Sequence, residues 1–122
     1  MKNIAICCLE DNEHVMISER LGRSPWIAIY SQEDRSWRFW ENTQNLNAPQ
    51  GAGIQTAQNI INAGAQVLIT RNAGPKAMRV LQQTDIEIFE APSGTNITEC
   101  INLYEKNELK QLEDANVEGH WV

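Results

Sequence analysis

A polar stretch at residues 42–50 divides the chain. Before it, the apolar residues have the spacing of β-strands, and after it they mostly have the spacing of α-helices. Residues 4–9 form an unbroken apolar run, which is typical of a strand covered on both faces. Residues 26–30 and 37–40 are aromatic and β-branched and flank a polar turn, so they predict a β-hairpin. The polar stretch between Leu9 and Pro25 predicts a long loop.

Helices and strands alternate in the prediction for the rest of the chain. Apolar residues at helical spacing predict a helix from Gly51 to about Gly64, a second beginning at Pro75 and a third through Tyr104. Short apolar runs at 66–70 and 86–90 predict the intervening strands. The alternation implies parallel pairing, so we expect a three-layer α/β/α domain with a mixed five-stranded sheet.

Length and charge narrow the classes of function. The 122 residues suffice for one domain, which we assign to residues 1–106, with an acidic C-terminal tail at 107–122. The net charge of −6 argues against nucleic acid as a partner. No apolar run is long enough to span a membrane, and the three cysteines show no paired spacing. We therefore expect a reduced, cytoplasmic protein.

Three predicted strand-to-helix turns lie at one edge of the sheet, where helix N-termini offer unpaired N–H groups. The turn residues are Gly51, Ala52 and Gly53, then Asn72 and Gly74, then Ser93, Gly94 and Thr95. Four cations belong to the same loops, namely Arg20, Arg23, Arg71 and Lys76, with Gly22 between the first two. Together these residues predict an anion-binding cleft. The alternative is that they are ordinary turns, which need Gly, Asn and Ser in any case.

Catalysis finds little support in the sequence, and we expect no enzymatic activity. No nucleophile motif, Walker loop or GxGxxG occurs, and His14 and His120 have no partner nearby in sequence. Cys7 and Cys8 close the first strand and are weak candidates for binding a soft metal as thiolates. The alternative for both is packing as small apolar side chains.

Four of these motifs, in order, resemble one family. Ser18–Trp26 resembles the family pattern Ser-Glu-His-Phe-Gly-Arg-Ala-Pro-Tyr. The turns at 51–53, 72–77 and 93–95 fall where the same family has glycine-rich turns. The family is the dinitrogenase iron–molybdenum cofactor biosynthesis group, and the resemblance covers about residues 2–110. It implies a ribonuclease H-like fold with five strands, the second antiparallel to the others.

The resemblance also implies a function. Better-known members of the family are non-enzymatic carriers of the nitrogenase cofactor or its iron–sulfur precursor, and another holds a molybdenum–copper sulfide cluster. The resemblance thus implies that an iron–sulfur or molybdenum cluster, or a thiomolybdate-type anion, binds here and passes between donor and acceptor proteins. The isolated protein can then be the apo form. The family histidine is Arg20 in this chain, and a guanidinium stays protonated, so ligation of iron at that position is not expected.

A second hypothesis needs no cofactor. The hairpin residues Trp37 and Trp40 would form a contact face for a partner or for a second copy, in a monomer or weak homodimer with an interaction or regulatory role. This hypothesis predicts an exposed hairpin tryptophan and a filled, dry cleft.

Overall fold

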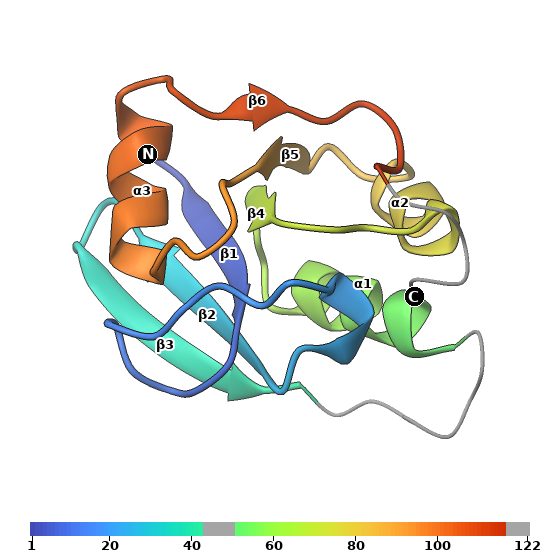
Figure 1. Ribbon diagram of the computed structural model, residues 1–122, viewed down its shortest axis with the longest axis horizontal. Coiled ribbons are helices and arrows are strands. Elements are labelled where there is room, and N and C mark those ends of the chain that lie inside the picture. The colour runs from blue at the N-terminus through green and yellow to red at the C-terminus, as the bar shows by residue number, and fades with distance from the viewer. Residues whose placement is uncertain (43–50, 117–122) are drawn as a thin grey trace.

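The computed structural model describes residues 1–42 and 51–116, which form one mixed sheet with helices on its two faces (Figure 1). The strands are β1 (Asn3–Cys8), β2 (Trp26–Ser31), β3 (Ser36–Glu41), β4 (Val67–Thr70), β5 (Glu87–Glu90) and β6 (Lys110–Gln111). The helices are α1 (Ala52–Asn62), α2 (Pro75–Leu81) and α3 (Ile97–Glu105), together with the short 3-10 helix η1 (Leu21–Arg23).

The sheet has six strands in the order β3-β2-β1-β4-β5-β6, so the expected five-stranded sheet was one strand short. β1, β4 and β5 are parallel, and β2 is antiparallel to β1, as the sequence predicted. The extra strand, β6, pairs antiparallel with β5 inside the segment predicted to be a tail. A strand of two residues is too short to show a periodic pattern, so the sequence did not reveal β6. The ribonuclease H-like class and the domain boundary at residue 106 stay predictions.

Apolar side chains fill both faces of the sheet and confirm the three layers. One cluster joins the sheet to α1 and α2 and includes Cys7, Ile60 and Leu81. The other joins the opposite face to α3 and includes Cys8 and Ile97. Neighbouring residues of β1 thus alternate between the two cores, as the pleat of a strand requires.

Local signals account for the helix ends. Gly64 follows α1 with a φ of +81°, a conformation that glycine adopts without strain. Pro75 occupies the first turn of α2, as predicted. The side chain of Asn96 caps α3 by accepting a hydrogen bond from the N–H of Glu99 at 2.8 Å.

The loop between β1 and β2 is held across the carboxyl ends of the parallel strands. Isolated bridges join Cys8 to Ile17, Met16 to Asn96 and Arg20 to Asn72. The N–H of Ile17 also donates to the carbonyl of Thr95 at 2.9 Å. These contacts place the loop beside the β4–α2 and β5–α3 turns.

Candidate anion-binding pocket

A pocket of about 420 Å³ lies between the loop after β1 and the β5–α3 turn. Its lining residues are Leu9, Met16, Ile17, Ser18, Glu19, Arg20, Arg23, Ser93 and Gly94. Four of the candidate residues are among them, namely Arg20, Arg23, Ser93 and Gly94. Gly22 is buried within η1, between the two arginines. Residues far apart in sequence therefore meet here as lining of one pocket.

The pocket combines charge with apolar surface. Leu9 and Met16 are 49% and 41% exposed, high values for large apolar residues. Arg20 and Arg23 are exposed beside them. Gly94 has a φ of +76°, and a Cβ at that position would lie 4.0 Å from the terminal methyl of Met16. Sequence reasoning missed Leu9, Met16 and Glu19, since nothing in their local pattern marks them as pocket residues.

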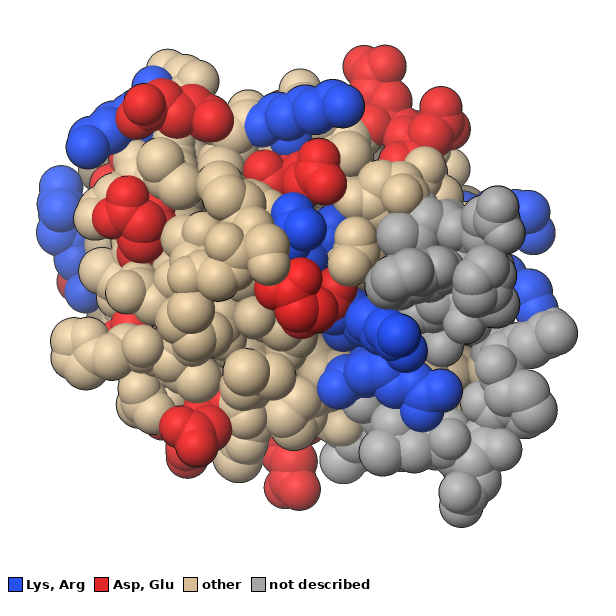
Figure 2. All heavy atoms as spheres, in the orientation of Figure 1, with Lys and Arg blue, Asp and Glu red and all other residues tan. Residues whose placement is uncertain are grey.

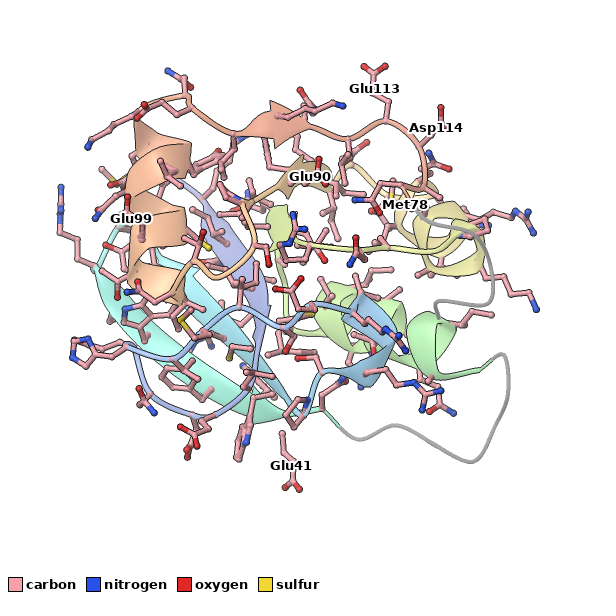
Figure 3. All side chains as sticks on the ribbon, in the orientation of Figure 1. Glu41, Met78, Glu90, Glu99, Glu113 and Asp114 are labelled. Carbon is pink, nitrogen blue, oxygen red and sulfur yellow. The ribbon has the colours of Figure 1, made fainter. Side chains whose placement is uncertain are left out.

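Arg71 does not line this pocket, because its side chain is held by neighbouring groups. Its Nη1 donates to the carbonyl of Ala91 at 2.6 Å and lies 3.7 Å from Oε2 of Glu90. Its Nε lies 3.4 Å from Oε1 of Glu19. Figure 3 labels Glu90 at β5, and Figure 2 shows basic and acidic side chains next to one another near the centre of this face. Arg71 is thus a cross-link between loops.

The remaining turn residues are engaged in the fold. Asn72 donates through Nδ2 to the carbonyl of Glu19 at 2.8 Å, and Thr95 donates through Oγ1 to the carbonyl of Pro92 at 2.6 Å. Gly74 is the buried N-cap of α2, and Lys76 lies half-buried in the first turn of the same helix.

The glycine turn at 51–53 begins α1, with Ala52 and Gly53 buried. The helix packs against η1, which adjoins the pocket through Arg23. Of the three predicted turns, only the Ser93–Gly94 turn lines the pocket.

Cys7 and Cys8 are fully buried, on opposite faces of the sheet. Burial raises the pKa of each thiol to about 12, so both are neutral at physiological pH. Neither sulfur is accessible to a metal ion, which agrees with the packing alternative. Within residues 1–42 and 51–116, no group of three His, Cys, Asp or Glu side chains is arranged to hold a metal. His14 is exposed beside Glu13, and His120 lies outside the described residues.

Sequence comparison decides the family. The family model of the dinitrogenase iron-molybdenum cofactor matches residues 2–107. The chain belongs to this family. A curated relative, the uncharacterized protein MJ0580 of Methanocaldococcus jannaschii, is 34% identical over 87 residues, which are 71% of this chain and 72% of the relative.

Two solved structures have the same fold as this chain. The apo form of the orange protein from Desulfovibrio gigas superposes with a TM-score of 0.88 at 24% identity, covering 96% of this chain and 98% of that one. A NifB-like protein from Thermotoga superposes with a TM-score of 0.80 at 23% identity, covering 98% of this chain and all of the other.

Arg20 lines the pocket. A guanidinium donates hydrogen bonds and carries a charge but has no free lone pair for a metal. The pocket therefore offers electrostatic and hydrogen-bonding contacts at this position. Across the described part of the chain, every helix is too short or too polar to cross a bilayer.

Proposed function

We propose that this chain is a binding and carrier protein for an anionic metal–sulfur species, held noncovalently in the pocket between the loop after β1 and the β5–α3 turn. The observation that carries the proposal is the placement of Arg20 and Arg23 beside exposed Leu9 and Met16. A sulfide-coated anion has diffuse charge and a polarisable surface. Guanidinium groups are weakly hydrated and Met sulfur is polarisable, so both suit such a surface.

Membership of this family supports a metal–sulfur species as the bound ligand. The family is that of the dinitrogenase iron-molybdenum cofactor, and an apo orange protein and a NifB-like protein share the fold of this chain. We take the cargo to be an iron–sulfur or molybdenum cluster, or a thiomolybdate-type anion, exchanged with donor and acceptor proteins in the cytoplasm. The role is non-enzymatic: arginine side chains hold an anion and release it without bond chemistry.

The cofactor-free hypothesis retains one supporting observation. Trp40 is 47% exposed on the hairpin, as that hypothesis expects. Its second expectation was a filled and dry cleft, whereas the pocket has about 420 Å³ of open volume. The pocket therefore favours the carrier, and the hairpin needs a separate explanation.

Anaerobic titration with tetrathiomolybdate, followed by visible absorption, tests the carrier. We expect saturable binding by the wild-type chain and about tenfold weaker binding by Arg23→Gln, because hydrogen bonds to charged groups contribute roughly 1.5–3 kcal/mol. Arg79→Gln is the matched control, since Arg79 is exposed in the last turn of α2 and does not line the pocket. Equal loss in both variants, or no binding at all, would overturn the proposal.

A further inference from the structure

β3 is a regular six-residue strand at one edge of the sheet (Figure 1). Its pairing with β2 is continuous from Ser36 to Glu41, without a bulge. The opposite edge is β6, which has two residues and carries Lys110. Short edge strands, lysines, prolines and bulges protect sheet edges from pairing with other chains. β6 has two of these features. β3 is longer and has no lysine, proline or bulge, and its charged residues are Arg38 and Glu41, so β3 is the edge more open to a partner.

The hydrogen bonds of the hairpin show which backbone groups face outward. The N–H of Asn42 donates to the carbonyl of Pro25 at 2.9 Å, which continues the register of Glu41 with Trp26. In an antiparallel ladder, residues that exchange hydrogen bonds alternate with residues that do not. The even-numbered residues of β3 therefore bond to β2. Trp37, Phe39 and Glu41 direct their N–H and C=O groups away from it, and no described strand lies on that side.

The order of residues selects one register for pairing with a second copy. Outward-facing residues must oppose outward-facing residues, so an antiparallel pair can centre on Arg38, Phe39 or Trp40. Centring on Arg38 sets like charges opposite each other, which is destabilising. Centring on Trp40 leaves the outward groups of Trp37 without a partner in β3. Centring on Phe39 pairs every outward residue of β3, with Phe39 opposite Phe39 and Trp37 opposite Glu41.

The side chains are complementary in this register. Arg38 is directly opposite Trp40 of the second copy, in a non-hydrogen-bonded pair whose Cα atoms are about 4.5 Å apart. Guanidinium and indole groups at such a distance form a cation–π contact. On the other face, Tyr30, Trp37 and Phe39 already form a row with ring centroids 4.9 and 6.0 Å apart. Phe39 of the second copy would extend this row across the junction.

We propose that two copies of this chain associate through β3, antiparallel and centred on Phe39, so that their sheets become continuous. The pairing accounts for the exposure of Trp40, which Arg38 of the second copy would cover. It is independent of the carrier function, because no residue of β3 lines the pocket.

Sedimentation velocity over a range of protein concentrations tests the association. The wild-type chain is expected to pass from monomer to dimer as concentration rises. Arg38→Gln should weaken the dimer about tenfold, because it removes two symmetric cation–π contacts of about 0.5–1 kcal/mol each. Arg79→Gln is the control, since it removes the same charge from an exposed position in the last turn of α2, outside β3. A monomer at every concentration, or equal weakening by both variants, would overturn the proposal.

Cysteine cross-linking tests the register. Opposed residues in a hydrogen-bonded pair have Cα atoms about 5.5 Å apart, within the range of a disulfide. Phe39→Cys should therefore form a covalent dimer on mild oxidation, and Arg38→Cys and Trp40→Cys should not. The native thiols are buried and do not compete. Cross-linking of either of the latter two variants in preference to Phe39→Cys would overturn the register.

A further variant covers the case in which Phe39→Cys does not fold. Glu41→Pro removes an outward N–H, and proline is tolerated where the N–H of an edge strand faces solvent. This variant should keep the circular dichroism of the wild type and dimerise more weakly. Unchanged dimerisation of folded Glu41→Pro would contradict pairing through this edge.

Discussion

The carboxylate of Glu19 lies 3.4 Å from Nε of Arg71, and this pair connects the pocket to the ends of β4 and β5. The second carboxylate oxygen of Glu19 accepts a hydrogen bond from Oγ of Ser93 at 2.9 Å. Arg71 in turn reaches the carbonyl of Ala91 and the carboxylate of Glu90. One acidic side chain of the lining is thereby tied to two turns, which makes the shape of the pocket dependent on residues outside it.

Replacing Arg71 should lower the free energy of unfolding. Arg71→Ala removes the 2.6 Å hydrogen bond to Ala91 and the contacts with two carboxylates. Because Glu19 is half exposed, the ion pairs contribute little, and we expect a loss of about 1–2 kcal/mol in the free energy of unfolding. Urea unfolding measures it, with exposed Arg79→Ala as the control. An unfolding midpoint equal to that of wild type would show that the cross-link contributes nothing.

Arg71 also illustrates the limit of prediction from sequence. Its place directly after the buried strand β4 is as predicted, but its side chain does not line the pocket, as the sequence had predicted it would. The direction of its side chain depends on Glu19 and Glu90, which are distant in sequence, and a local pattern does not encode such contacts. Gly64 and Pro75 were predicted correctly because a backbone φ is set by the residue itself. The turns were therefore predictable from the sequence, whereas the contacts of the side chains in them were not.

The C-terminal segment is the clearest failure of periodicity as a signal. Asn116 donates through Nδ2 to the carbonyl of Arg71 at 2.7 Å and to Glu90 at 3.1 Å. Its Oδ1 accepts from the N–H of Ala73 at 2.8 Å. Polar contacts and the two residues of β6 hold this segment, together with buried Leu112. Hydrophobic spacing does not report such contacts.

Asn116→Ala should accordingly destabilise the fold. The substitution leaves the N–H of Ala73, a buried residue, without its acceptor, and a lost hydrogen bond of this kind costs about 1–3 kcal/mol. Urea unfolding measures the loss, and proteolysis measures the release of the segment. Asn107→Ala does not serve as the control, because Asn107 has a positive φ. Asp114→Ala is the better match, since Asp114 is exposed in the same segment, and an equal loss in both variants would contradict a specific role for Asn116.

The cysteines should make stability fall at alkaline pH. Burial raises the pKa of Cys7, Cys8 and Cys100 from 9.0 to about 12. Between these values the unfolded chain loses thiol protons that the folded chain keeps, so the unfolded state is favoured as pH rises. The free energy of unfolding should decline from pH 9 upward, and Cys100→Ala should decline less steeply. A thiol reagent at neutral pH should modify the native protein only after denaturant is added.

Removing the charge of Glu19 should strengthen anion binding. In the pocket its carboxylate lies on the same lining as Arg20 and Arg23, where it repels an incoming anion. Glu19→Gln keeps an oxygen for Ser93 and removes the charge, so tetrathiomolybdate should bind about threefold more tightly, as expected for charges several ångströms apart in a solvated site. The gain should shrink as salt is added, because exposed charges are screened. Glu13→Gln makes the same charge change outside the pocket and should leave affinity unchanged. An equal gain in affinity in both variants would show that net charge alone is responsible. Weaker binding by Glu19→Gln would show that the carboxylate supports the pocket through its contacts with Ser93 and Arg71.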